Sequence, residues 1–264
     1  MLNIAITAGG TSETIDGVRK LTNVSTGRLG WQCLEAVLQY LSASADSDFH
    51  VYYIHTETAF RSELADEAKQ KVEFITVTDA ASVYASVDDL TKSVDITHFI
   101  HSMAISDFTY SYGIGIGRLA QELHDQIVAN PNISVQKIEA ILTNPQSSYQ
   151  TDTKISSKEP LLIGLETTRK VIPLIKKNNP NTFLVGFKLL RNATEADLMC
   201  EAARLTKQNG CDMVFANELS TISAGSGHTG LLIQNGEVVA RPTGKDNIAE
   251  TIVESMLKLK PQKK

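Results

Sequence analysis

The chain has 264 residues, of which 42% are hydrophobic and 21% charged, and its formal net charge is −5. This composition allows a sizeable core and excludes a disordered chain, and the acidic balance disfavours a nucleic-acid or anionic-membrane surface. The N-terminal stretch MLNIAITAGG has no signal-peptide pattern, and no apolar run is long enough to cross a bilayer. Cys33, Cys200 and Cys211 show no metal-ligand spacing and cannot all pair, which favours a reducing cytoplasm.

Strands and helices are predicted to alternate along most of the chain. Apolar, β-branched runs predict strands, and stripes at helical spacing predict helices; Asn235-Gly236 between two apolar runs indicates a hairpin. In chain order we expect strand 2–8, helix 27–43, strands 49–56 and 72–78, helix 79–94, strands 96–106 and 160–167, helix 169–179, strand 182–190, helix 194–210, strand 211–220, hairpin 229–244 and helix 246–260. This order predicts an α/β fold with a doubly wound, mainly parallel (Rossmann-like) sheet, helices on both faces and a C-terminal β-hairpin.

Residues 109–160 break this alternation, since they contain one clear helix and much polar connection. A connection of this length is more often an insertion or a lid than a plain loop. We therefore expect a single nucleotide-binding domain over 1–264 with an insertion or lid at about 109–160. The GIGIG stretch at 113–117 is predicted to be a flexible loop whose glycines act as hinges.

The connection between the first strand and the first helix is unusually rich in glycine and hydroxyl side chains. Its spacing fits neither a P-loop nor the GxGxxG dinucleotide fingerprint. A loop that enters a helix N-terminus presents free backbone N–H groups to an anion, and glycines allow close approach. We therefore predict a phosphate-binding connection in which Arg28 adds charge. Its members are Gly9, Gly10, Thr11, Ser25, Gly27, Arg28 and Gly30.

Polar or aromatic residues follow three other predicted strands, where ligands of parallel sheets bind. Asp107 could bind a substrate hydroxyl, an amide or Mg²⁺, or it could cap a turn. Phe187 and Lys188 end one strand and Asn217 ends another. Singly, a core phenylalanine and a turn asparagine explain them as well; together they indicate one cleft, with Phe187 stacked on a base and Asn217 bonded to a nucleotide.

The motifs ITAGGT, DGVRKLTNVSTGRLG, SMAISDF, KISS, VGFKLL and ANELS occur in the order seen in phosphopantothenoylcysteine synthetases (phosphopantothenate–cysteine ligases), which the chain therefore resembles. The resemblance is to the stand-alone form, with a separate decarboxylase as a partner. It implies a cytoplasmic homodimer that joins 4′-phosphopantothenate and L-cysteine through an acyl-nucleotide intermediate in coenzyme A biosynthesis. CTP is expected in preference to ATP, with Mg²⁺, and pyrophosphate is released.

The resemblance also implies roles for individual residues. Asn23 holds the activated acid, Arg19 reaches the substrate of the neighbouring subunit, and Lys154 belongs to a flap. The KISS stretch lacks the lysine run of many relatives, so further flap charge is expected from one of Lys158, Arg169 and Lys170. Met103, Ala104 and Asp107 bind the pantothenate arm; Gly9, Ser25, Gly27 and Gly30 hold the nucleotide phosphates; Phe187 and Asn217 line the base and ribose pocket. No metal ligands are assigned.

Two alternatives remain at this point. A Rossmann-type NAD(P)-dependent reductase would need an acid at the end of the second strand to hold a ribose. The only acid available there is Glu57, which comes after the end of the predicted strand 49–56. A non-catalytic, regulatory paralogue of the ligase would share the fold without the chemistry.

Overall fold

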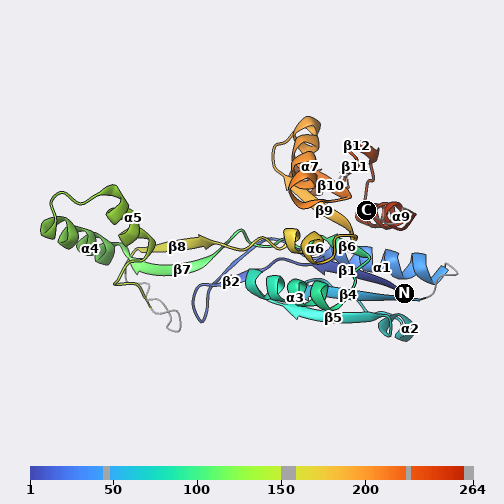
Figure 1. The fold of residues 1–264 in the computed structure, drawn as a ribbon, viewed down its shortest axis with the longest axis horizontal. Helices are drawn as coiled ribbons and strands as arrows, with labels where there is room; N and C mark the ends of the chain where they lie inside the picture. Colours follow the sequence, from blue (N-terminus) through green and yellow to red (C-terminus); the bar gives the residue numbers. More distant parts are fainter. Residues whose placement is uncertain (44–47, 150–158, 224–226, 259–264) are drawn as a thin grey trace. The chain divides into compact units, whose positions relative to one another are not determined.

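The computed structural model describes residues 1–43, 48–149, 159–223 and 227–258. The chain divides into two compact units, which are described separately (Figure 1). The first, called the sheet unit, comprises Met1–Thr11, Val24–Ile105 and Lys170–Lys264. The second, called the hairpin unit, comprises Ser12–Asn23 and Ser106–Arg169, so it contains the region predicted as an insertion together with part of the glycine-rich connection.

The sheet unit contains one eight-stranded sheet in the order β12-β11-β10-β9-β6-β1-β4-β5. The last six of these strands are parallel, and β11 and β12 pair antiparallel at one edge. The order of the parallel strands is that of the doubly wound dinucleotide-binding folds, so the predicted fold class is confirmed. The strands are β1 (Leu2–Ala8), β4 (Phe49–Thr56), β5 (Val72–Val77), β6 (His98–His101), β9 (Phe183–Leu190), β10 (Met213–Glu218), β11 (Leu231–Gln234) and β12 (Glu237–Ala240).

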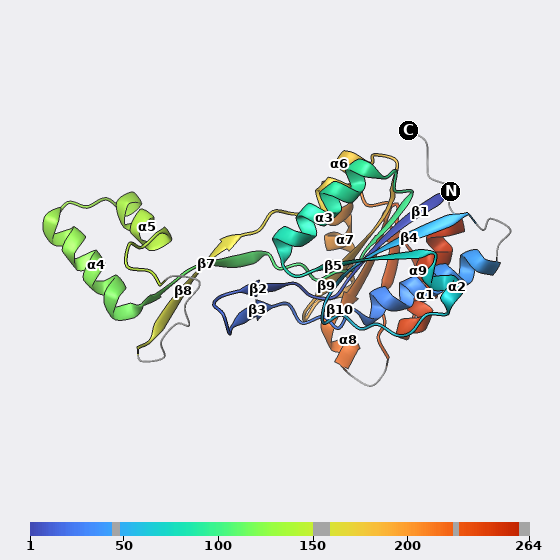
Figure 2. The same ribbon diagram turned by 90° about the horizontal axis from the view of Figure 1, so that it is seen from below.

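Helices cover both faces of this sheet (Figure 2). The core on one face includes side chains of α1 (Arg28–Ala43) and α9 (Lys245–Lys258). The core on the other includes side chains of α3 (Ala80–Ser93), α6 (Ile172–Asn178) and α7 (Glu195–Asn209). Two short helices, α2 (Asp66–Lys69) and α8 (Leu219–Ser223), complete the unit. No helix in the described ranges is both long and apolar enough to span a bilayer.

Local sequence signals set several of these boundaries. Asp79 caps α3, since its side chain accepts a hydrogen bond from Ser82 N at 2.7 Å. Thr194 and Asp197 form a capping box at the start of α7, which ends at Gly210 in the left-handed region (φ +68°). The predicted C-terminal hairpin is also confirmed: Asn235 and Gly236 take φ values of +52° and +81° between β11 and β12.

In its described residues, the hairpin unit contains two antiparallel pairs of strands and two helices. β2 (Ser12–Thr14) pairs with β3 (Lys20–Thr22), and β7 (Phe108–Gly115) pairs with β8 (Leu161–Thr167). Between β7 and β8 lie α4 (Ile116–Ala129) and α5 (Val135–Thr143), which share a small core. The prediction of a flexible loop at 113–117 is wrong, because Gly113–Gly115 are paired in β7 and Ile116 begins α4.

Candidate functional site

Two glycines allow loops to pack closely together at the carboxyl end of β1 in the sheet unit. Gly9 has φ +102°, and a Cβ there would overlap Thr56 Oγ1 and lie 3.0 Å from Ala59 Cβ. Gly27 has φ +70°, and a Cβ there would lie 2.9 Å from Ala59 Cβ and 3.0 Å from Gly9 N. Both the backbone conformation and the space therefore require glycine. The loops that follow β1, precede α1 and follow β4 consequently meet in close backbone contact.

The N-terminus of α1 opens at the same place. Gly30 packs against the end of β1, since a Cβ there would lie 2.6 Å from Ala8 Cβ and 2.9 Å from Ser102 Oγ. The caps at this helix start are long hydrogen bonds of 3.4 Å, from Gly27 N to Ser25 Oγ and from Arg28 N to Thr26 Oγ1. Weakly bonded amides at a helix N-terminus, next to a strand end, suit an anion. We call Gly9, Gly10 and Ser25–Gly30 the glycine cradle.

The side chain of Arg28 lies over the ring of Phe60, with its guanidinium carbon 4.9 Å from the ring centroid. Phe60 is 37% exposed, and its backbone N–H donates to Thr26 O at 2.8 Å. Phe60, in the loop that follows β4, thus lies against the glycine cradle and contacts its arginine. The place of Arg28 was predictable from the sequence, whereas its contact with Phe60 was not.

The loop after β6 is tied to the cradle through its backbone. Ala104 N donates to Gly9 O at 2.9 Å, and Thr11 N donates to Ala104 O at 3.1 Å. Met103 N donates to Thr7 Oγ1 at 3.3 Å, and the Met103 side chain is buried in the core. Thr11 is fully buried. The sheet unit therefore brings Met103, Ala104 and Thr11 beside the cradle, where they shape the loop through backbone bonds.

Phe187 and Asn217, predicted to end two strands, lie on the sheet face covered by α1 and α9. Phe187 packs against Phe215 with ring centroids 5.8 Å apart. Asn217 Nδ2 lies 2.9 Å from Nε2 of His228, whose ring meets that of Phe215 edge-on at 6.0 Å. His228 was not found from the sequence; its only signal is its place just before the hairpin strand that pairs with β10.

Lys188 faces the other side of the sheet from Phe187. Its Nζ lies 3.2 Å from Glu201 Oε2 on α7. Hydrogen bonds from Arg204 and then Lys188 lower the pKa of Glu201 to about 2, so this carboxylate is charged throughout the neutral range. The structure therefore places Lys188 in an ion-pair cluster with α7 and away from Phe187 and Asn217.

Arg19 and Asn23 belong to the β2–β3 segment of the hairpin unit. Asp16 holds the turn: its Oδ1 accepts hydrogen bonds from Val18 N at 2.9 Å and Arg19 N at 2.8 Å. Asp16 is buried, and its Oδ2 lies 3.5 Å from Arg19 Nη1. Asn23 directly follows β3. Asp16 was missed from the sequence, although Asp16-Gly17 is a turn signal that could have indicated it.

Asp107 is exposed at the start of β7 in the hairpin unit. Its carbonyl accepts a hydrogen bond from Thr168 N at 3.0 Å, and Ser106 O accepts one from Thr168 Oγ1 at 2.6 Å. These bonds fix the backbone from which the carboxylate projects. Lys154 and Lys158 lie outside the described residues, whereas Arg169 and Lys170 are described and exposed.

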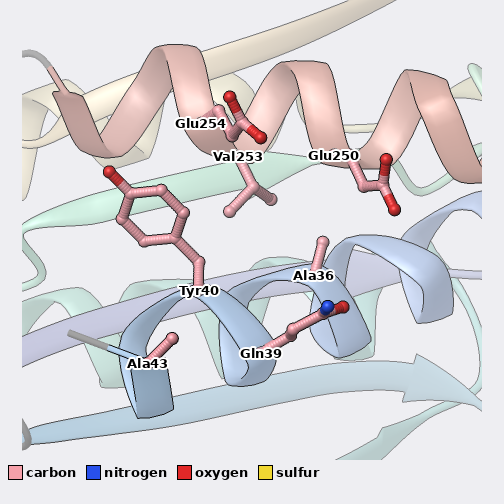
Figure 3. A pocket seen from close by; sticks show the side chains of 7 residues that line it. All are labelled: Ala36, Gln39, Tyr40, Ala43, Glu250, Val253 and Glu254. Carbon is pink, nitrogen blue, oxygen red and sulfur yellow. The ribbon is translucent and has the colours of Figure 1, made fainter.

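A separate pocket lies between the C-terminal half of α1 and the middle of α9 (Figure 3). No predicted site residue lines it; its lining residues are Ala36, Gln39, Tyr40, Ala43, Glu250, Val253 and Glu254. Nor do three or more His, Cys, Asp or Glu side chains converge as a metal site anywhere in the described ranges. A Mg²⁺ ion held largely by nucleotide phosphates and water needs no such set.

The strand order, the helices on both faces and the glycine cradle at the carboxyl end of β1 define a doubly wound α/β protein. The model of the family described as DNA/pantothenate metabolism flavoprotein C-terminal domain matches residues 1–133 and 118–259. The chain belongs to this family.

Curated relatives carry the name coenzyme A biosynthesis bifunctional protein CoaBC. The relative from Methanocaldococcus jannaschii is 26% identical over 97% of this chain and 50% of its own length. The relative from Thermococcus kodakarensis is 24% identical over 84% of this chain and 42% of its own length. The chain thus spans about half the length of these relatives.

Solved structures agree with this assignment. The DNA/pantothenate metabolism flavoprotein from Streptococcus pneumoniae is 29% identical, with a TM-score of 0.75 over 98% of this chain and 99% of that one. A Cab2 mutant in complex with phosphopantothenate-cysteine shares the fold, with 16% identity and a TM-score of 0.65 over 97% of this chain and 85% of that one. The family model and the CoaBC relatives confirm the family resemblance that the sequence motifs indicated, and the Cab2 structure adds a likeness of fold.

Proposed function

We propose that this protein is a nucleotide-dependent ligase that joins 4′-phosphopantothenate to L-cysteine in coenzyme A biosynthesis. The observation that carries the proposal is the glycine cradle at the N-terminus of α1, in a chain whose family relatives are named for this biosynthesis. CTP is the preferred nucleotide in the proposal, ahead of ATP. The cytoplasmic location remains a prediction.

The proposed reaction has two steps. The pantothenate carboxylate attacks the α-phosphate of the nucleotide, so a C–O–P bond forms and pyrophosphate leaves. The amine of cysteine then attacks the acyl carbon, gives up a proton, and displaces the nucleoside monophosphate. Neither step needs a protein nucleophile, so the contribution of the chain is positioning and stabilisation of negative charge.

The sheet unit supplies groups suited to the nucleotide. Backbone N–H groups of Gly27 and Arg28, with the hydroxyls of Ser25 and Thr26, would bind its phosphates at the helix N-terminus. Phe187 and Asn217 would bind the nucleoside. Mg²⁺, bound through the phosphates, would neutralise part of their charge.

The hairpin unit supplies groups suited to the acid. In the proposal Asn23 and Asp107 bind phosphopantothenate through hydrogen bonds, and Arg19 contributes positive charge. Asp16 keeps the Arg19 backbone and guanidinium in place, because it bonds to both. Lys154 would add charge from the flap.

We also propose that the protein is a homodimer. Phe108, Ile163 and Leu165 are 47%, 40% and 44% exposed, and the register of the β7–β8 pair puts them on one face. An exposed apolar strand face favours association. Light scattering after size exclusion should give twice the chain mass for the wild type and a shift toward the single-chain mass for Leu165→Ser. A single-chain mass in the wild type would contradict the dimer.

The ligase proposal is tested by pyrophosphate release from phosphopantothenate, cysteine, Mg²⁺ and either CTP or ATP. Pyrophosphate release that depends on both the acid and the nucleotide is expected. Asn23→Ala removes a group that holds the activated acid in the proposal, so this substitution should reduce the rate of release at least about a hundredfold without loss of fold. No release with either nucleotide would refute the ligase. NAD(P)H turnover would instead support a reductase, and binding without turnover would support the regulatory paralogue.

A further inference from the structure

Asn217 and His228 form a buried polar pair at the carboxyl end of β10. They are 6% and 9% exposed, and Asn217 Nδ2 lies 2.9 Å from His228 Nε2. Phe215 packs its ring edge-on against the imidazole, so the ring cannot turn freely. Both residues lie in the sheet unit, on the face where Phe187 packs.

The orientation assigned to the Asn217 amide sets the direction of this hydrogen bond. With Nδ2 placed toward the ring the amide donates, so Nε2 is the acceptor and the neutral ring carries its proton on Nδ1. Burial, assisted by the nearby charge of Lys245, lowers the pKa of His228 and favours this neutral form. The Nδ1 atom is buried and has no hydrogen-bond partner among the described residues.

This bond also determines where the other half of the Asn217 amide points. Since Nδ2 donates to the ring, Oδ1 is directed away from it. No described residue donates a hydrogen bond to Oδ1. Oδ1 also does not belong to the described side-chain atoms that are both shielded from solvent and without a hydrogen-bond partner. An amide can present either its oxygen or its nitrogen to a ligand, and without an acceptor such as Nε2 it could reverse. Asn217 is therefore held ready as an acceptor.

We propose that His228 is a positioning residue of the nucleoside pocket: it fixes the Asn217 amide so that Oδ1 accepts a hydrogen bond from the bound nucleotide. The inference rests on the proposed function in that the ligand is a ribonucleoside triphosphate. The donor on that ligand is a ribose hydroxyl or the exocyclic amino group of the base. Both are neutral donors, and they are distinguished by ligand analogues.

The test compares His228→Phe, which removes the acceptor but keeps a ring, with His228→Gln, whose amide oxygen can still accept from Asn217. His98→Phe is the matched control, because His98 is also buried, with an unpartnered Nε2, but begins β6 at the amino end of the sheet. Binding of CTP, 2′-deoxy-CTP, 3′-deoxy-CTP and UTP with Mg²⁺ is measured by calorimetry, with thermal unfolding as the check on folding.

The wild type should bind CTP about tenfold more tightly than the one analogue that lacks the donor, as expected for one neutral hydrogen bond. The His228→Phe variant should bind CTP only as tightly as it binds this analogue. The affinity for the analogue itself should be the same in the variant and in the wild type. His228→Gln should recover most of the discrimination. His98→Phe should keep it fully even if its unfolding midpoint falls. In turnover, His228→Phe should raise KM for CTP but not for cysteine.

Equal discrimination in the wild type and His228→Phe would overturn the inference, as would a wild type that binds all four nucleotides equally or binds none. The failure of the ligase proposal is a different result. If the wild type releases no pyrophosphate but discriminates among the nucleotides through His228, the positioning role stands and the ligase proposal does not.

Discussion

Replacing Gly30 with alanine tests the contact that holds helix α1 against the end of β1. The added methyl would lie 2.6 Å from Ala8 Cβ and 2.9 Å from Ser102 Oγ. Carbon atoms in favourable contact are roughly 3.5–4.0 Å apart, so the methyl overlaps Ala8 by about 1 Å. Neither neighbour yields easily, because Ala8 belongs to the central sheet and Ser102 Oγ donates to Thr7 O at 2.6 Å.

The expected magnitude is a balance of two effects. Overpacking of this kind costs about 1–3 kcal/mol, and the large overlap favours the upper end. Alanine in place of glycine within a helix returns about 1 kcal/mol. The net loss in the free energy of unfolding is therefore about 2 kcal/mol, which in a chain of this size lowers the unfolding midpoint by about 4–8 °C.

Thermal unfolding of a double-mutant cycle measures this contact. Ala8→Gly removes the nearest atom, so Gly30→Ala should be less harmful in that background, with a coupling of about 1 kcal/mol or more. Gly17→Ala is the matched control, because a Cβ there meets nothing within 4 Å and Gly17 does not have positive φ. An unchanged midpoint in Gly30→Ala, or strict additivity with Ala8→Gly, would show that α1 does not approach β1 this closely.

Three further predictions concern titration and the hairpin turn. Burial raises the pKa of the Cys33 and Cys211 thiols to about 12. A thiol reagent at pH 8 should therefore label only the exposed Cys200. Rapid labelling of the Cys200→Ser variant would contradict this prediction. Burial lowers the pKa of His98 to about 4, below its ordinary 6.5, so the unfolded chain binds the proton first as the pH falls. Urea unfolding should therefore show stability falling between pH 6.5 and 4, with on the order of 2 kcal/mol lost through His98 by pH 5, and His98→Leu should lack that part. Asp16→Ala should release Arg19, because Asp16 bonds to its backbone and lies beside its guanidinium. The loss of this charged hydrogen bond should raise KM for phosphopantothenate about tenfold. An equal rise in KM for the nucleotide would point to general misfolding.

The fold was predictable because its signals are local and mutually consistent. Strand and helix periodicities alternate, and Gly210 and Asn235-Gly236 stop elements where left-handed backbone is needed. The stretch at 113–117 was misjudged because glycine favours loops in isolation. Its pairing depends on β8, where Gly113 faces Ile163 and Gly115 faces Leu161, and no local pattern reports that long-range contact.

The same distinction applies to the site. Gly9 and Gly27 were identifiable because strained backbone and close approach demand glycine wherever they occur. Phe187 and Lys188 were grouped, although neighbours in a strand face opposite sides, and Lys188 pairs with α7. His228 acts through a partner in another element, which no spacing along the chain reveals.

The hairpin unit is discontinuous in the chain, since its two segments are separated by β4, β5 and β6. Residues 12–23 leave the ribosome before residues 106–169. Strand β7, against which β2 packs, is therefore synthesised much later than β2. A two-stranded hairpin alone is marginally stable, so β2–β3 should become protected from hydrogen exchange only when β7 and β8 have paired. The segment that carries Arg19 and Asn23 is thus among the last to acquire its final structure, and a fragment cut at 106 and 169 would be made without it.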